Sequence, residues 1–484
     1  MRKLAPLSIV LVLGCDAPRA LDPRVAPVEQ AGELVVLTRL SPTTRYVNPT
    51  GQYSGMENDL AVMFAKELNV PVRFKDHVPL AGILPKLRHQ VAHLAAAGIA
   101  ASPETRTDFV ISSEYQRTQQ VVAFNSDGAG PKSILDLTTK SVAVLKGSRA
   151  ASLLRELRRL FPGLRWTEIE SGEVHDVLAK LADGHVDVVV TDGHAVDVAR
   201  NFFPNVQRAF ALGAPEPLVW VFPKNVEPAL VERANQFFAR LKRDGTLNRL
   251  TDQYYGHLHR METLDIENLI EKIQTVLPKF RAHFQRAEEI TGIDWRLLAA
   301  IGFQESHWDP LATSSTGVRG LMMLTEDTAD YLGVDDRLDA KQSILAGARF
   351  FLDLKERISD KVQEPDRTYM ALAAYNIGLG HLEDARIQAR RLHLNPNLWV
   401  DVKKALPMLA LPEHYVNLKY GFARGGEAVI LTENIRNYYD VLGRFQPPHE
   451  PGLQLPASLR SPSSWRRNLP GAWYGVAELP EPKS

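Results

Sequence analysis

Residues 297–310 have the sequence LLAAIGFQESHWDP, whose apolar positions follow the period of an α-helix. Leu298, Ile301 and Glu305 lie at positions i, i+3 and i+7, so they share one face of that helix. Asp294 is a suitable N-cap for it. Burial raises the pKa of a carboxyl group, and a general acid that works near neutral pH needs a raised pKa. Glu305 is therefore a candidate catalytic residue, and a structural carboxylate paired with a cation is the alternative.

Three later segments favour the catalytic interpretation. They are SSTGVRGLMML at residues 314–324, AAYNIG at 373–378 and ENIRNY at 433–438. With Gln304-Glu305-Ser306 they resemble, in order and spacing, the four signature segments of the lytic transglycosylase (SLT) domain, which is similar to goose lysozyme. Within that family, GVRGLMML is most similar to the membrane-bound lytic murein transglycosylase F branch. The resemblance implies an all-α, lysozyme-like domain at residues 265–445, where helical periodicity dominates and strand signals nearly vanish.

The resemblance implies that Glu305 cleaves peptidoglycan. It would protonate the glycosidic oxygen between N-acetylmuramic acid and N-acetylglucosamine, and then take a proton from the muramic acid 6-hydroxyl. The product would carry a 1,6-anhydro ring and no added water. The substrate's N-acetyl group would stabilise the cationic intermediate, so a second carboxylate is not required, unlike in most glycosidases. We interpret the nearby Asp309, Asp327 and Asp330 as capping or solvated residues, and a hydrolytic muramidase on the same scaffold is the alternative function.

The resemblance places five further residues at the glycan: Ser314, Met323, Tyr375, Asn376 and Tyr438. Ser314 would bond the N-acetyl group, although a role in a turn is equally consistent with its polar surroundings. Tyr375 would orient Glu305 or the substrate, with a buried core tyrosine as the alternative. Asn376 could equally end a helix. Met323 departs from the glutamine that many relatives have there, and a thioether cannot replace an amide donor, so we expect it to pack the cleft wall.

Residues 33–256 alternate short apolar runs with amphipathic helices, which favours an α/β fold with a largely parallel sheet. Strand candidates are residues 34–37, 142–145 and 186–190. The region resembles the periplasmic solute-binding domain of the polar amino-acid type, in which GMENDL at residues 55–60 matches an early element. The expected architecture is therefore multi-domain: a two-lobed α/β domain like a periplasmic binding protein, followed by the all-α domain.

The same resemblance indicates a ligand pocket in the first domain. Gly147 and Ser148 lie at a strand-to-helix turn whose backbone amides can hold a carboxylate. Asp192 stands where the family binds a ligand amine. Thr105 replaces the family's carboxylate-binding arginine, and Arg106, one residue along, is the candidate to restore the contact. The alternative is that the pocket no longer takes free amino acids.

A muropeptide or an amino-acid-like molecule is the expected ligand of this pocket, because peptidoglycan stems carry both amines and carboxylates. We expect this ligand to modulate cleavage by the second domain. The alternative is that the first domain only positions the enzyme on the cell wall.

Residues 1–15 are expected to be a lipoprotein signal peptide. Their apolar run is too short to span a bilayer, and VLGC at residues 12–15 resembles a lipobox, in which Cys15 would be acylated. An ordinary signal peptide with a chance cysteine is the alternative. We expect residues 16–32 to form a tether and the Pro-rich residues 446–484 to be a disordered tail. The expected location is periplasmic and lipid-anchored at the outer membrane, although an aspartate after the acylated cysteine is an inner-membrane signal in enteric bacteria.

The charge composition argues against binding to nucleic acid. Lysine plus arginine and aspartate plus glutamate both number 57, so the formal net charge is zero and no global basic field is present. The expected partners are peptidoglycan strands and, through acyl chains, a membrane. We expect neither a metal nor a cofactor. A non-catalytic receptor is disfavoured because Glu305, Ser314 and Tyr375 are all present.

Overall fold

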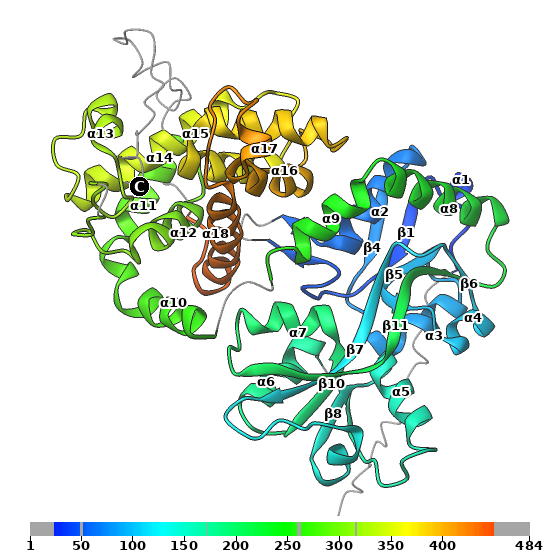
Figure 1. Ribbon diagram of the computed structural model, residues 1–484. Coiled ribbons are helices and arrows are strands. Elements are labelled where there is room, and N and C mark those ends of the chain that lie inside the picture. Colours follow the sequence, from blue (N-terminus) through cyan, green and yellow to red (C-terminus); the bar gives the residue numbers. More distant parts are fainter. Residues whose placement is uncertain (1–23, 49–51, 171, 259–262, 315–316, 450–484) are drawn as a thin grey trace, which may run out of the picture.

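The computed structural model describes residues 24–48, 52–170, 172–258, 263–314 and 317–449. Within them an α/β part is followed by an all-α part (Figure 1). The expected fold class is confirmed. Cys15 and residues 450–484 lie outside the described residues, so the predicted signal peptide and most of the predicted tail do too.

The described α/β part is built on one nine-stranded mixed sheet, not the largely parallel sheet expected, because the two long strands that join its halves pair antiparallel to their neighbours. The strands, in spatial order, are β4 (Val72–Lys75), β1 (Leu34–Leu37), β5 (Leu94–Ala100), β11 (Val206–Phe222), β7 (Gln116–Asn125), β10 (Val188–Asp192), β8 (Val142–Leu145) and β9 (Thr167–Ile169), while β6 (Val110–Ile111) pairs with β11. A separate hairpin joins β2 (Tyr46–Val47) and β3 (Tyr53–Ser54). Strand β1 is parallel to β4 and β5 and fully buried, as its continuous apolar run predicts.

The sheet carries two lobes, which the long strands β7 and β11 connect (Figure 1). Lobe 1 contains β1, β4, β5 and β6 with α1 (Val28–Ala31), α2 (Met56–Glu67), α3 (Leu80–Arg88), α4 (Pro103–Asp108), α8 (Pro228–Arg243) and α9 (Thr246–Tyr255). Lobe 2 contains β8, β9 and β10 with η1 (Ile134–Thr139), α5 (Arg149–Leu157), α6 (Val174–Ala182) and α7 (Gly193–Arg200). Each lobe has its own apolar cores.

The last part of the expected tether packs on lobe 1 instead of extending away from it. Val28 is buried in a lobe 1 core, and the Val25 amide donates to the Gln90 carbonyl oxygen at 2.8 Å. The His93 ring contacts the Ala26 carbonyl oxygen at 2.8 Å. Valine side chains that gain burial hold this segment, which the Pro-rich and charged composition did not indicate.

The all-α part surrounds one extended core. Its helices are α10 (Thr263–Thr275), η2 (Leu277–Lys279), α11 (Arg281–Thr291), α12 (Trp295–Ser306), α13 (Glu326–Leu332), α14 (Ala340–Arg357), α15 (Asp366–Arg391), α16 (Trp399–Ala405), η3 (Leu406–Ala410), α17 (Pro412–Tyr415) and α18 (Gly425–Phe445). Helix α15 is interrupted at Gly378, where φ is 82° and ψ is 154°. Among the described residues, no helix has the length and apolarity to cross a bilayer.

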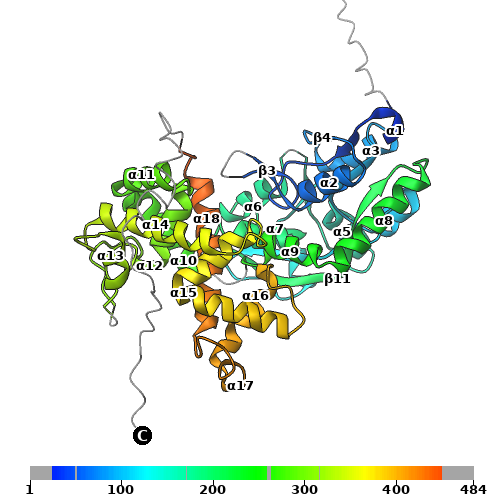
Figure 2. The same ribbon diagram turned by 90° about the horizontal axis from the view of Figure 1, so that it is seen from above.

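Helix α18 packs against the other helices of the all-α part and also contacts both lobes (Figures 1 and 2). Its Arg436 donates to the Asp252 carbonyl oxygen of α9 at 2.7 Å. Its Asn437 donates to the His257 carbonyl oxygen at 2.6 Å and accepts from Asn201 of lobe 2 at 3.2 Å. One helix of the second part therefore contacts both lobes of the first.

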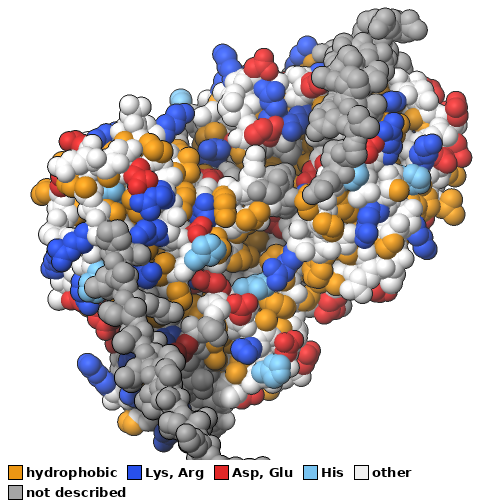
Figure 3. All heavy atoms as spheres, turned by 180° about the vertical axis from the view of Figure 1, so that it is seen from behind, with side chains coloured by type: hydrophobic (Ala, Val, Ile, Leu, Met, Phe, Trp, Pro, Cys, Tyr) orange, Lys and Arg blue, Asp and Glu red, His pale blue; other side chains and the backbone are white. Residues whose placement is uncertain are grey.

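The surface carries both signs of charge. On the face that Figure 3 presents, acidic and basic side chains are interspersed over both parts of the molecule. This distribution agrees with a formal net charge of zero. A mixed surface of this kind does not supply the concentrated positive field with which proteins attract nucleic acid.

The two lobes touch at Gly147. This residue follows β8 of lobe 2, and a Cβ atom built on it would lie 2.5 Å from Cα of Ala81 in α3 of lobe 1. Its φ of +76° also belongs to the left-handed region that glycine adopts most readily. The close approach of the lobes therefore requires glycine at this position.

We predict that Gly147→Ala destabilises the protein more than Gly184→Ala does. Gly184 shares a positive φ of +73° but has open space where its Cβ would be, so it controls for backbone strain of about 1–2 kcal/mol. The clash with Ala81 should cost a further ~1–3 kcal/mol or push the lobes apart. Calorimetric unfolding and small-angle X-ray scattering of both variants check this. Equal losses of stability with an unchanged radius of gyration would contradict it.

Candidate active site

Glu305 lies in the last turn of α12, as the sequence predicts. The helix begins after Asp294, whose Oδ1 accepts a hydrogen bond from the Arg296 amide at 2.8 Å, so the expected N-cap is confirmed. Burial raises the pKa of Glu305 to about 7, and among the described residues no charged neighbour contributes to the shift. Glu305 is therefore not the cation-paired carboxylate of the structural alternative.

The turn that follows α12 is held by an aromatic cluster. His307 and Trp308 both have positive φ, of 52° and 60°, which residues other than glycine seldom adopt. Burial of the Trp308 indole offsets this cost, and its Nε1 donates to the Ala299 carbonyl oxygen at 2.8 Å. The Phe303 ring lies 4.9 Å from the Trp308 ring and 4.9 Å from the Tyr438 ring. The end of the helix, and with it Glu305, is thus fixed in place.

The loop before α13 packs directly on α12. A Cβ on Gly302 would lie 2.8 Å from the end of the Leu321 side chain, so glycine allows this close approach without a shift of that side chain. Ser306 Oγ donates to the Leu321 carbonyl oxygen at 2.7 Å, and the Tyr375 hydroxyl donates to the Met322 carbonyl oxygen at 3.0 Å. Helix α12, this loop and α15 therefore meet beside Glu305.

Tyr375 lies within electrostatic reach of Glu305. Burial raises the pKa of the Tyr375 phenol well above its usual range, and the Glu305 carboxylate raises it further. The phenol therefore stays protonated, and its proton is donated to the Met322 carbonyl oxygen. The structure brings these two predicted residues together, although they lie in separate signature segments.

The other four residues predicted to contact the glycan differ in their burial and contacts. Ser314 Oγ accepts from the Val318 amide at 3.2 Å, which is the turn role considered for it. Met323 is partly buried with a φ of 47°, and Asn376 is exposed on α15. Tyr438 is buried in the core against Phe303, on a different face of α12 from Glu305. Tyr375 is the predicted residue whose described contacts place it beside the carboxyl group.

The candidate second acids have other surroundings. Asp309 accepts from the Leu311 amide at 2.9 Å and so caps the turn after α12. Asp327 lies in the first turn of α13, where a negative charge favours the helix N-terminus, and both it and Asp330 are exposed. Among the described residues, no group of three or more His, Cys, Asp or Glu could hold a metal ion.

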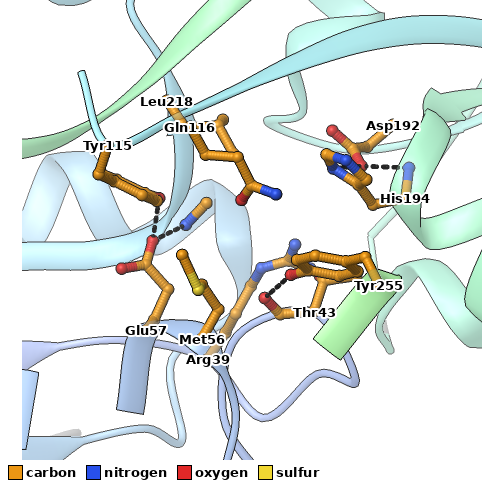
Figure 4. Close-up of a pocket in the computed structure, with 11 residues that line it drawn as sticks. Arg39, Thr43, Met56, Glu57, Tyr115, Gln116, Asp192, His194, Leu218 and Tyr255 are labelled. Carbon is orange, nitrogen blue, oxygen red and sulfur yellow. Dashed lines mark hydrogen bonds and ion pairs between the residues drawn. The ribbon is translucent and has the colours of Figure 1, made fainter. Parts of the chain in front are cut away.

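A second site lies between the lobes (Figure 4). It is lined by Arg39, Thr43, Met56, Glu57, Gly98, Tyr115, Gln116, Asp192, His194, Leu218 and Tyr255. Glu57 is buried and accepts from the Gly98 amide at 2.7 Å, the Tyr115 hydroxyl at 2.5 Å and Trp220 Nε1 at 2.9 Å. Burial raises its pKa despite these bonds.

Of the pocket residues expected from the sequence, Asp192 lines this pocket. Its Oδ1 accepts from the His194 amide at 2.9 Å, so it also caps α7. Arg106 is exposed on α4, and its Nε donates to the Ala101 carbonyl oxygen at 3.2 Å. Ser148 caps α5 by accepting from the Ala151 amide at 3.2 Å. Arg106, Gly147 and Ser148 are not among the described residues that line the pocket.

Sequence reasoning missed Arg39 and Tyr255. Arg39 comes just after β1, at the carboxyl end of a parallel strand, where α/β proteins commonly bind ligands. That position was an available signal. Tyr255 ends α9 and stacks on His194 of lobe 2 with 4.6 Å between ring centroids, while its hydroxyl donates to the Thr43 carbonyl oxygen at 3.1 Å. Its partners are remote in sequence, so no local pattern indicated it.

Comparisons with known proteins cover both parts of the chain. Residues 282–396 match the family model of the transglycosylase SLT domain, and residues 34–257 match that of bacterial extracellular solute-binding proteins, family 3. The membrane-bound lytic murein transglycosylase F of Methylobacillus flagellatus is 46% identical over 92% of this chain and 94% of its own length. That of Nitrosospira multiformis is 44% identical over 96% and 98%.

The chain belongs to the membrane-bound lytic murein transglycosylase F family. In this family member the SLT match contains α12 with Glu305, and α18 lies beyond it. Solved structures resemble the first part. A mutant arginine-binding protein of T. maritima is 22% identical over 47% of this chain and 97% of its own, with a TM-score of 0.44. An ancestral arginine-binding protein bound to arginine is 25% identical over 46% and 98%, with a TM-score of 0.43.

We predict that Glu305→Gln stabilises the fold at alkaline pH. The pKa of about 7 in the folded protein exceeds the usual 4.5, so the folded state holds a proton that the unfolded state loses between these values. Stability is therefore lost as pH rises from about 4.5 to 7. A neutral isostere removes this loss, and its Tm should exceed that of the wild type at pH 8 but not at pH 4.

The control for this comparison is Glu267→Gln, which changes an exposed carboxyl on α10. It should shift Tm little at either pH. A gain for Glu305→Gln that is the same at pH 4 and pH 8 would show that the carboxyl is not held in its neutral form.

Proposed function

We propose that this enzyme cleaves the β-1,4 bond between N-acetylmuramic acid and N-acetylglucosamine in peptidoglycan, without adding water. The observation that carries the proposal is Glu305, a carboxyl with a pKa of about 7 and no charged neighbour contributing to that pKa, in the part of the chain that matches the SLT domain. The names of the relatives support murein as the substrate.

In the first step, protonated Glu305 donates its proton to the glycosidic oxygen, and the bond from that oxygen to C1 of the muramic acid breaks. The N-acetyl oxygen of the same sugar stabilises the positive charge at C1. In the second step, the Glu305 carboxylate takes the proton of the 6-hydroxyl, whose oxygen bonds to C1 and closes the 1,6-anhydro ring. A pKa near 7 suits both steps, because the group must lose and regain a proton at similar cost.

The residues around Glu305 are proposed to position the glycan. Tyr375 holds the Met322 carbonyl and so fixes the loop that faces α12. Met323, next in that loop, would supply an apolar wall, and Ser314 and Asn376 would contribute polar contacts at the rim. Tyr438 would act indirectly, by supporting Phe303 from the core.

Hydrolysis on the same scaffold is less well supported. Most inverting and retaining hydrolases use a second carboxylate across the scissile bond. Asp309 is engaged by the Leu311 amide, and Asp327 is placed to stabilise the start of α13. These positions favour the transglycosylase reaction, in which the substrate itself supplies the nucleophile.

We predict that Glu305→Gln reduces the cleavage rate at least ~100-fold, because the amide keeps the shape but has no transferable proton. Asp309→Asn is the matched control, a change from carboxyl to amide four residues away, and it should keep most of the activity. Digestion of purified sacculi with mass analysis of the products gives both rate and product. If the wild-type enzyme gave products with reducing muramic acid ends in place of 1,6-anhydro ends, it would be a muramidase.

We further propose that the protein is held at the membrane by acyl chains on Cys15, on the periplasmic side of the outer membrane. The names of the relatives support membrane attachment. Cys15→Ser should move the protein into the soluble periplasmic fraction, since the acyl chains would supply the anchoring energy. Fractionation on a sucrose gradient distinguishes the two membranes. A variant that still sediments with membranes would contradict the anchor.

The solute-binding part is proposed to bind a muropeptide or amino-acid-like ligand and to modulate cleavage. Helix α18 supports this, because it contacts α9 through Arg436 and lobe 2 through Arg444, whose Nη2 lies 2.7 Å from His175 Nε2. Burial, and then the Arg444 charge, lower the pKa of His175 to about 4, so the neutral ring accepts this bond. A ligand that changes the angle between the lobes must alter these contacts.

We predict that Arg444→Gln weakens the response of cleavage to D-alanyl-D-alanine or a stem peptide while leaving binding intact. Arg424→Gln, at the other end of α18, is the control, since Arg424 pairs only with Glu427 in the described contacts. Cleavage of sacculi with and without peptide is compared for both variants. A full response in Arg444→Gln would show that the lobe 2 contact does not transmit the signal.

A further inference from the structure

The pocket between the lobes has its positive charge in an unexpected place. Thr105, at the position of the family's arginine, is buried, and its hydroxyl bonds to Ser102 Oγ at 3.0 Å. Arg106 lies outside the pocket. Among the described residues that line the pocket, Arg39 is the one lysine or arginine. A carboxylate that enters the pocket therefore meets Arg39.

Arg39 is buried and oriented by contacts from both lobes. Only 8% of the residue is exposed, and its Nε lies 3.4 Å from the Ala97 carbonyl oxygen of β5 in lobe 1. Its Nη1 donates to Oε2 of Glu173 at 2.6 Å. Glu173 directly precedes α6 of lobe 2, so this ion pair joins the lobes. The guanidinium already binds a carboxylate, which demonstrates that the position suits an anion.

The two acidic residues of the pocket, Glu57 and Asp192, have different surroundings. Glu57 already accepts three hydrogen bonds from lobe 1 and is 1% exposed, which makes it part of the pocket wall. Asp192 comes from lobe 2, and its side chain is 29% exposed. In Figure 4 Arg39 and Glu57 come from one side of the pocket and Asp192 and His194 from the other. A carboxylate-binding and an amine-binding group thus belong to opposite lobes.

We propose that Arg39 binds the carboxylate of the ligand, and that this carboxylate exchanges with Glu173 on the guanidinium. The ligand class is a small molecule with a free amine for Asp192 and a free carboxylate for Arg39, either a free amino acid or the end of a peptide. This inference rests on the proposed role of the domain in binding ligand. Because the ligand carboxylate and Glu173 compete for the N–H donors of one guanidinium, ligand binding weakens the Arg39–Glu173 pair.

The test is calorimetric binding to the full-length protein, with no measurement of cleavage, so its outcome is independent of the proposed catalytic function. The probes are D-alanine and D-alanyl-D-alanine, each compared with its C-terminal amide, and they distinguish a free amino acid from a peptide end. Wild type should bind at least one acid about tenfold or more tightly than its amide, since a charge-assisted pair is lost in the amide.

Three variants locate the anion-binding residue. Arg39→Gln should reduce the preference for acid over amide to about twofold or less, and Arg39→Lys, which keeps the charge, should retain part of it. Glu173→Gln should keep the preference and tighten acid binding, because it removes the competing carboxylate. Arg106→Gln should change neither. Unfolding temperatures confirm that each variant is folded.

Several results would overturn the proposal. They are a preference that survives in folded Arg39→Gln, a preference that disappears in Arg106→Gln, weaker acid binding in Glu173→Gln, and a wild type that binds no acid probe or binds acids and amides equally.

Discussion

The constraint on which the second half of the molecule depends is a half-buried glutamate, Glu305, with no counter-charge among the described residues. The contrast with Glu433 of α18 makes this clear. Burial raises the pKa of Glu433, but Arg436 and Lys403 outweigh it, and the net shift is downward. Glu305 has burial without these cations, and its pKa rises to about 7. Two glutamates of one domain thus differ in their pKa because of their neighbours: Glu433 has cationic partners, whereas Glu305 has none among the described residues and is suited to proton transfer.

A half-buried carboxyl with no counter-charge among the described residues requires rigid surroundings. The backbone after Glu305 has two successive residues with positive φ, and the buried Trp308 indole offsets that strain. Phe303 links this turn to Tyr438 of α18, and the residues just before Tyr438 contact α9 and lobe 2. Helix α18 therefore both supports α12 and forms part of the interface with the first domain.

The sequence predicted local features better than contacts between distant segments. The period of α12, its cap at Asp294 and the alternation of strands and helices were all visible, because each depends on residues near one another. Tyr438 of the segment ENIRNY was predicted to contact the glycan, whereas it packs against Phe303, and the preceding Arg436 and Asn437 bond to residues of the first domain. A buried polar residue on a helix face has the same local pattern whether its partner is a substrate or another domain.

The pocket of the first domain illustrates the same difficulty. The family's motif indicated Arg106 as the carboxylate-binding residue, because a motif locates a functional group by its position in the chain. Binding of a carboxylate requires only that a positive charge lie in the pocket, and the Arg39 side chain reaches the pocket from the end of β1. Its partner Glu173 belongs to the other lobe, so the charge that serves ligand recognition also serves contact between the lobes. An exchange at this ion pair changes a contact between the two lobes. Helix α18 bonds to α9 of lobe 1 through Arg436 and to Asn201 of lobe 2 through Asn437. A change in the relative position of the lobes therefore alters the contacts of the helix that supports α12 and Glu305.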